Sequence, residues 1–162
     1  MAKRIAQQMT PEEVLATQFG GPDSGVFTDG SCDPNPGVGG WGWVWVESGE
    51  ILAQGNGRSP DTTTNNRMEL QALIEAFKTL PDDRDLIAYS DSQLCVNTIN
   101  EWAPGWEKRG WKRKGGPIKN LELVQELYAL ANAKPRIKLQ WIRAHEGTRW
   151  NEYADALAAL DA

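Results

Sequence analysis

The sequence contains few of the features that stabilise or anchor proteins outside a reducing cytoplasm. Its 162 residues include two cysteines, Cys32 and Cys95, which are too few for a disulfide framework and do not form a Cys-x-x-Cys pair. No run of about 18 apolar residues occurs, which excludes a membrane-spanning helix of the usual kind. Residues 1–24 contain no apolar core of about 7–15 residues, so we expect no secretory signal. These absences predict a cytoplasmic protein.

Two common types of catalytic site are also absent from the sequence. The chain has one histidine, His145, and no spacing of Cys and His residues typical of a zinc site. It has no glycine-rich P-loop for binding nucleotide phosphates. The length suits one domain with a single hydrophobic core. We therefore look for chemistry carried by other side chains.

The charge is distributed unevenly along the chain. The net charge of −5, taken alone, argues against nucleic-acid binding. Residues 108–119, the basic segment, carry +6, whereas the rest of the chain carries −11, from 11 basic and 22 acidic residues. The six basic residues are Lys108, Arg109, Lys112, Arg113, Lys114 and Lys119.

Tryptophans accompany the basic segment. Trp106 and Trp111 interleave with the basic residues, and Trp102 lies just upstream. A solvated loop with hydrophobic anchors would have this composition, and so would a contact surface for a phosphate backbone. The basic segment by itself leaves both interpretations open.

Hydrophobic periodicity predicts alternating secondary-structure elements. We predict strands at residues 25–28, 41–45, 51–56, 86–90 and 136–142, and helices at about 66–79, 92–99, 121–130 and 151–160. The first strand is predicted to end near Asp29, and Asn65 or Asn66 to cap the helix at 66–79. A three-strand start followed by alternating helices and strands predicts an α/β fold with a mixed sheet flanked by helices. The strand at 86–90 is apolar enough to be buried on both faces. Residues 1–24 are predicted to form an N-terminal tail with a short helix capped by Thr10, and residues 25–162 the main domain.

Three polar residues follow predicted strands at their carboxyl ends. Asp29 and Asp91 come directly after apolar strands, and His145 follows the last strand after a short loop. Ligands of open α/β sheets bind at the carboxyl ends of parallel strands. The topology therefore predicts that these three residues lie close together.

Four carboxylates are candidates for a metal site: Asp29, Glu69, Asp91 and Asp155. Taken singly, each has an ordinary structural explanation, because Asp often caps a turn and Glu or Asp often lies on a solvated helix face. Four carboxylates close together would repel one another unless divalent cations neutralised them, and Mg²⁺ prefers such oxygen ligands. Two ions about 3.5–4 Å apart would suit an in-line phosphoryl displacement.

Four sequence blocks, in order, resemble the type 1 ribonuclease H family. The blocks are Thr28–Cys32 with Asn35–Gly37, Thr64–Leu70, Ser90–Gln93, and His145–Gly147 with Asn151, Glu152 and Asp155. The resemblance extends from about Val26 to Leu160. It implies a ribonuclease H-like fold, with a five-stranded mixed sheet whose first three strands are antiparallel and whose remaining strands are parallel. It also implies an endoribonuclease that cleaves the RNA strand of RNA–DNA hybrids and leaves 5′-phosphate products.

The resemblance implies roles for the candidate site residues. Asp29, Glu69, Asp91 and Asp155 match the family's metal-binding carboxylates, which hold two Mg²⁺ ions, with Mn²⁺ as a substitute. His145 matches a mobile histidine that assists proton transfer or product release, a role that suits a side chain titrating near neutral pH.

The resemblance also implies contacts with the hybrid substrate. Asn35, Asn65, Asn66 and Gln93 match residues that contact the hybrid, and Thr64 matches a contact to a DNA phosphate. The part of the chain from Trp102 to Lys119 resembles a basic protrusion that grips the DNA strand in some family members. Turn and cap chemistry is the structural alternative for the amides, and packing is the alternative for the tryptophans.

Some features of the sequence depart from the family pattern or leave alternatives open. Thr148, Arg149 and Trp150 differ from the residues common in the family, which puts the behaviour of the preceding loop in question. A reverse-transcriptase or integrase fragment of the same fold, and a non-catalytic hybrid-binding module, are the alternative functions. We expect a monomer with no membrane association and no obligate protein partner. Pairing of Cys32 with Cys95 remains open.

Overall fold

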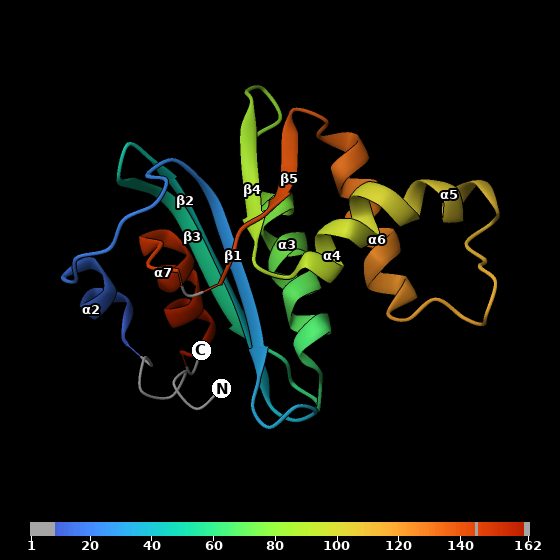
Figure 1. Cartoon of the computed structure of the whole chain (residues 1–162), viewed down its shortest axis with the longest axis horizontal. Helices are drawn as coiled ribbons and strands as arrows, with labels where there is room; N and C mark the ends of the chain where they lie inside the picture. The colour runs from blue at the N-terminus through green and yellow to red at the C-terminus, as the bar shows by residue number, and fades with distance from the viewer. Residues whose placement is uncertain (1–8, 145, 161–162) are drawn as a thin grey trace.

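The computed structural model describes residues 9–144 and 146–160, which contain one five-stranded sheet with helices on both faces (Figure 1). The strands are β1 (Gly25–Cys32), β2 (Gly39–Glu47), β3 (Glu50–Arg58), β4 (Leu86–Ser90) and β5 (Ile137–Trp141). Their spatial order is β3-β2-β1-β4-β5. The pairs β1–β2 and β2–β3 are antiparallel, whereas β1–β4 and β4–β5 are parallel. The predicted mixed sheet is confirmed.

The helices divide between the two faces of the sheet. They are α2 (Pro11–Leu15), α3 (Asn65–Thr79), α4 (Gln93–Asn97), the π-helical turn η1 (Thr98–Trp102), α5 (Ala103–Lys108), α6 (Leu121–Ala133) and α7 (Arg149–Ala158). Helices α2 and α7 lie on one side, and α3, α4 and α6 lie on the other (Figure 1). Within the described ranges, no helix combines the length and apolar character needed to cross a bilayer.

Strand β1 is longer than predicted, because it has different partners along its two halves. Only Val26–Thr28 pair with β4, whereas the antiparallel pairing with β2 continues to Cys32. The prediction that β1 ends near Asp29 was therefore wrong. Asp29 is nevertheless the first residue after the part of β1 that pairs with β4. It therefore lies at the carboxyl end of the parallel strands, where the topology predicts a ligand site.

The tryptophans of β2 account for two glycines of β3. Trp43 is buried against the helical face that contains α3, and Trp41 packs beside it. A Cβ atom at Gly55 would lie 2.7 Å from Trp43 Nε1, and one at Gly57 would lie 2.5 Å from Trp41 Cζ2. The two indole rings thus cover positions of β3 where only glycine leaves room.

The chain after Asp91 is helical for longer than predicted. Ser92 caps α4 as its Oγ accepts a hydrogen bond from the Cys95 N–H, at 3.2 Å. The chain then passes through η1, where the Ala103 N–H donates to the carbonyl of Thr98, five residues earlier. Pro104 has no N–H and is tolerated in the first turn of α5. The predicted helix end near residue 99 was therefore wrong, and the helical region carries the chain to the basic segment.

Strand β4 is fully covered on one face and only partly on the other. Leu86, Ala88 and Ser90 are buried, but Ile87 is 37% exposed and Tyr89 is half-buried. Helix α7 packs mainly on β1 and β2, and of β4 only Tyr89 reaches its cluster. The prediction that both faces of this strand are buried was wrong, because the helix on the second face lies to one side.

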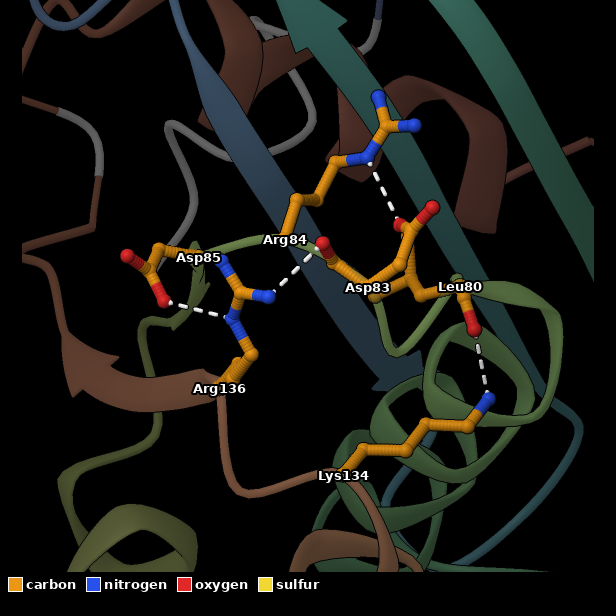
Figure 2. A network of polar contacts seen from close by, with 6 residues as sticks. All are labelled: Leu80, Asp83, Arg84, Asp85, Lys134 and Arg136. Carbon is orange, nitrogen blue, oxygen red and sulfur yellow. Dashed lines mark hydrogen bonds and ion pairs between the residues drawn. The ribbon is translucent and has the colours of Figure 1, made fainter.

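Polar contacts connect the end of α3 to the starts of β4 and β5 (Figure 2). Lys134 Nζ donates to the carbonyl oxygen of Leu80 at 2.6 Å, which satisfies a group at the helix end. The Arg136 guanidinium donates to the carbonyl of Asp83 at 2.9 Å and to the carboxylate of Asp85 at 3.0 Å. These contacts lie at the end of β4 opposite to Asp91.

The short helix α2 is capped as predicted and belongs to the packed structure. Thr10 Oγ1 accepts from the Glu13 N–H at 3.1 Å, and Glu13 Oε1 accepts from the Thr10 N–H at 2.9 Å. Val14 is 1% exposed and lies in a cluster with Trp150 and Tyr153 of α7. The division of residues 1–24 from residues 25–162 remains a prediction.

Candidate active site

Four acidic side chains from four different elements meet beside β1. Asp29 lies in β1, Glu69 in the second turn of α3, and Asp91 directly after β4. One carboxylate oxygen from each of these residues lies within 4.8 Å of the other two. Asp155 of α7 adjoins Asp29, with which it forms a side-chain hydrogen bond. The structure therefore brings together all four predicted carboxylates.

A glycine allows Glu69 to reach this cluster. A Cβ atom at Gly30 would lie 2.2 Å from the carbonyl carbon of Met68, so α3 and β1 are in direct backbone contact there. The Gly30 N–H donates to Glu69 Oε1 at 3.1 Å. The close approach of helix and strand thus sets the position of one carboxylate relative to the next.

The electrostatics of the cluster disfavour the ionised carboxylates. Burial raises the pKa of Asp29 well above its ordinary value, and the charges of Asp91, Glu69 and Asp155 raise it further. Burial and the charge of Asp91 likewise raise the pKa of Glu69, although the hydrogen bond from the Gly30 N–H lowers it in part. A bound cation would reverse this penalty, and a set of carboxylate oxygens is the donor set that hard divalent cations prefer. The residues present therefore fit a divalent metal ion.

The predicted substrate residues at the start of α3 also hold the fold together. Thr64, and not Asn65 or Asn66 as predicted, is the N-cap, because its Oγ1 accepts from the Arg67 N–H at 3.3 Å. Asn65 Oδ1 accepts from the Cys32 N–H at 2.7 Å, and the Asn65 N–H donates to Asn35 Oδ1 at 3.1 Å. Two of the predicted contact residues thus connect β1, the loop after it and α3.

A pocket of about 450 Å³ lies between α3 and the basic segment. Its lining combines apolar, aromatic and basic side chains, among them Asn66, Leu94, Trp102, Trp106, Lys114 and Lys119. Asn66 and Gln93 are both exposed, and Gln93 begins α4, two residues after Asp91. An exposed amide, Asn66, and the cations of the basic segment therefore line a common pocket.

The basic segment extends away from the sheet on the α5–α6 side (Figure 1). All six of its basic residues are exposed. Trp111 packs edge-on against Tyr128 of α6, with ring centroids 5.8 Å apart, whereas Trp102 is 41% exposed. Trp111 thus attaches the segment to α6, and Trp102 remains open to solvent.

Helix α7 contains a buried residue to which the sequence analysis assigned no role. Asn151 is 1% exposed, and its side-chain nitrogen and oxygen have no hydrogen-bond partner in the part of the chain that the structure describes. It lies one turn before Asp155, a four-residue spacing that could have identified it in the sequence. His145, the predicted proton-transfer residue, lies outside the described residues.

Both cysteines are free and buried. Cys32 Sγ lies 3.1 Å from the carbonyl oxygen of Pro34 and 3.2 Å from that of Thr63. Burial raises the pKa of the Cys95 thiol to about 11, against the hydrogen bond with Ser92, which lowers it.

We expect no rapid reaction of either thiol with a disulfide reagent in the native protein at pH 8. At that pH only about 0.1% of Cys95 would be thiolate, the reactive form, and burial hinders access to both sulfurs. Thiol titration should give two equivalents after unfolding without reductant. A thiol that reacts within seconds in the native protein would contradict the burial of the cysteines. Fewer than two thiols after unfolding would contradict their free state.

Comparisons with known proteins agree with this site and fold. The RNase H family model matches residues 22–162. A ribonuclease H of Methylorubrum extorquens (strain PA1) is 45% identical over 136 residues, which make up 83% of this chain and 58% of that protein. A ribonuclease H of Herminiimonas arsenicoxydans is 48% identical over 134 residues, which make up 82% of this chain and 90% of that protein.

The solved structures include a similar chain. The crystal structure of LC9-RNase H1, described as a type 1 RNase H with the type 2 active-site motif, has a TM-score of 0.70 and 34% identity. The match covers 88% of this chain and 72% of that one. The family match over residues 22–162, the identity with the two ribonucleases H and the shared fold lead to one conclusion: the chain belongs to the RNase H family.

Proposed function

We propose that this chain is an endoribonuclease that hydrolyses the RNA strand of RNA–DNA hybrids and leaves 5′-phosphate products. The observation that carries this proposal is the meeting of Asp29, Glu69 and Asp91, whose oxygens lie within 4.8 Å of one another. An exposed basic segment on the same molecule supports a nucleic-acid substrate. The names of the relatives support the same activity.

We propose that the resident metal is Mg²⁺, with two ions per site and Mn²⁺ as a substitute. Asp29 adjoins Glu69, Asp91 and Asp155, which supports the proposal that it would contribute to holding both ions. When bound, two such ions supply an activated water and stabilisation of the leaving 3′-oxygen. The four carboxylates would hold the ions, with Asp155 contributing to the second of them.

We assign proton transfer or product release to His145. An imidazole changes its charge near neutral pH, which suits both roles. The residue follows β5 in the sequence and precedes α7, the helix that carries Asp155.

Four amide side chains and the basic segment are proposed to recognise the two strands of the hybrid. Amide groups of Asn35, Asn65, Asn66 and Gln93 can hydrogen-bond to base edges and 2′-hydroxyls in the shallow minor groove. Thr64 and the basic segment would contact phosphates of the DNA strand. The 2′-hydroxyl contacts would discriminate against duplex DNA, and the geometry of the deoxyribose strand against duplex RNA.

One assay tests the proposed activity. The protein is incubated with Mg²⁺ and end-labelled RNA–DNA hybrid, duplex RNA, single-stranded RNA or duplex DNA. We expect cleavage of the RNA strand of the hybrid alone, with 5′-phosphate ends. Binding without cleavage would identify a non-catalytic module, and cleavage of DNA would place the chain with other nucleases of this fold. A single species of about 18 kDa in light scattering would agree with the proposed monomer.

The Lys112→Gln/Lys114→Gln double variant is expected to bind hybrid about 10-fold more weakly at low salt. Both lysines are exposed in the basic segment. Each lost phosphate contact should also reduce the slope of log K against log salt by about 0.9. Fluorescence anisotropy at several salt concentrations measures both effects. Lys138→Gln, which removes an exposed charge from β5, is the control, and an equal loss in the control would disprove a specific role for the segment.

A further inference from the structure

The residues before β1 pack on the start of α7. Val14 is buried in a cluster with Trp150 and Tyr153, and Met9 and Phe19 pack against the same cluster. Figure 1 shows α2 beside α7, on the face opposite to α3. This segment, residues 9–21, precedes the part of the chain that matches the RNase H family model, which begins at residue 22. It is therefore a feature that the family resemblance does not explain.

Hydrogen bonds connect this segment to the chain that enters α7. The Gly20 N–H donates to the carbonyl oxygen of Gly147 at 2.8 Å, and the Arg149 N–H donates to the carbonyl of Gly20 at 3.0 Å. The Arg149 guanidinium donates to the carbonyls of Leu15 at 3.2 Å and Thr17 at 3.4 Å. Backbone and side chain of one residue, Arg149, thus bind both ends of residues 15–20.

The two backbones are also in close contact at Gly21. This residue has a φ of +86°, and a Cβ atom there would lie 2.8 Å from Thr148 Cγ2 and 3.2 Å from Thr148 Cα. At Gly20, by contrast, a Cβ atom would have nothing within 4 Å. Of these two adjacent glycines, only Gly21 is therefore required for the close contact with Thr148.

The first turn of α7 depends on this contact because its own cap is incomplete. Thr148 is the N-cap residue, but its side chain makes no capping hydrogen bond. The bonds from Gly20 and Arg149 hold the chain at the helix entry instead. Helix α7 carries Asp155 six residues after Arg149, so a shift of its first turn would move that carboxylate relative to Asp29.

We propose that residues 9–21 are a positioning element for the active site, and that Arg149 is the positioning residue that couples them to α7. Through Gly147, Thr148 and Arg149 the element fixes the end of the β5–α7 loop and the direction in which α7 presents Asp155. This inference rests on the proposed hydrolysis of hybrids. The basic segment lies on the opposite face of the sheet, so we expect the element to act on turnover and not on binding of the hybrid.

The test compares Gly21→Ala with Gly20→Ala in steady-state hydrolysis of a hybrid. We expect Gly21→Ala to lower kcat about 10-fold with KM within about 2-fold, because small displacements of catalytic groups are costly. Gly20→Ala adds the same methyl group in open space and should retain the wild-type kcat. Equal kcat values for both variants and the wild type would overturn the proposal.

A second pair of variants separates positioning from stability. Arg149→Gln loses the guanidinium hydrogen bonds to the carbonyls of Leu15 and Thr17, at the start of α7. Arg58→Gln loses the hydrogen bonds from Arg58 Nη1 to the carbonyls of Ala158 and Leu160, at 3.4 and 3.2 Å, at the other end of the helix. Both should lower the Tm, but only Arg149→Gln should lower kcat, and Arg149→Lys should restore part of it. If both variants lower kcat equally, or neither does, the segment only stabilises α7 and the proposal is wrong.

One further measurement separates this inference from the proposed function. Hydrogen exchange at the Arg149 amide should be faster in Gly21→Ala than in Gly20→Ala, whatever reaction the protein catalyses. A wild-type protein that does not cleave hybrid, combined with faster exchange, would reject the proposed function and leave the contact established. Normal exchange in Gly21→Ala, in an enzyme that does cleave hybrid, would reject the inference alone.

Discussion

Replacing Asp29 with Asn is expected to lower hybrid cleavage by about 1000-fold or more and, at the same time, to stabilise the metal-free protein. The loss of activity follows from the central position of Asp29 among three other carboxylates. A contribution of several kcal/mol from metal-assisted catalysis corresponds to about three powers of ten in rate. The gain in stability follows because the substitution removes a buried charge that three neighbouring carboxylates repel.

The stabilisation should depend on pH in a defined direction. The pKa of Asp29 in the folded protein lies well above the ordinary value of 3.8, so between these two values the folded state holds a proton that the unfolded state has lost. The free energy of unfolding of the metal-free wild type therefore falls as the pH rises through this window. The advantage of Asp29→Asn should be absent below about pH 3.8 and largest above the folded pKa.

Thermal unfolding in the presence of a chelator, followed across this pH range, measures the effect. We expect the Tm of Asp29→Asn to exceed that of the wild type by a few degrees at pH 7. Asp61→Asn, at an exposed position, is the control and should change neither the Tm nor the activity. A variant with normal cleavage would show that Asp29 is not a metal ligand, and a lower Tm at pH 7 would contradict the repulsion.

The Gly30→Ala variant is expected to lose both stability and activity. The added methyl group would collide with the backbone of Met68, at 2.2 Å, so α3 must move away from β1. Overpacking a core costs about 1–3 kcal/mol when side chains can adjust, and a backbone collision leaves less freedom to do so. The displacement would also break the bond from the Gly30 N–H to Glu69 and move this carboxylate out of the cluster.

Denaturant unfolding and hybrid cleavage together measure this effect. We expect a loss of about 3 kcal/mol or more in the free energy of unfolding and a fall in kcat of about 100-fold. The kcat of Gly30→Ala is measured without denaturant and well below its unfolding temperature, so that the variant is folded to the same extent as the wild type. Gly20→Ala, with no atom within 4 Å of the new methyl, is the matched control. Wild-type stability in Gly30→Ala would show that α3 and β1 are not in backbone contact.

Much of the fold could be predicted from local patterns. The alternation of Trp41, Trp43 and Trp45 predicted β2, and the 3.6-residue spacing between Met68 and Phe77 predicted α3. The α3 prediction succeeded because this helix has one buried face, which imposes a 3.6-residue period. Strand β2 is buried on both faces, with Trp43 in the cluster that contains α3 and Val44 in the cluster that contains α7, but its tryptophans still recur with the two-residue period of a strand. The mixed character of the sheet followed from the sequence of elements, since connections between parallel strands need a crossover such as a helix.

The errors have a common physical origin in neighbouring elements. The end of β1 was predicted too early because the apolar run stops at Thr28, whereas pairing with β2 continues to Cys32. The outer face of Ile87 was predicted to be buried, but α7 lies over β1 and β2. The capping role of Thr64 could not be separated from Asn65 and Asn66, since all three residue types cap helices and side-chain orientation selects one of them.

By itself, the sequence determined the class of the fold, the family resemblance and the four carboxylates, because hydrophobic periods and short motifs are local properties. The tertiary structure alone decided how the site is assembled. It placed Glu69 beside Asp29 through the backbone contact at Gly30, and it enclosed the cluster so that burial raises the pKa of both groups. It also placed residues 9–21 against α7. Contacts between segments distant in the chain depend on the three-dimensional packing of both partners, which no local pattern contains.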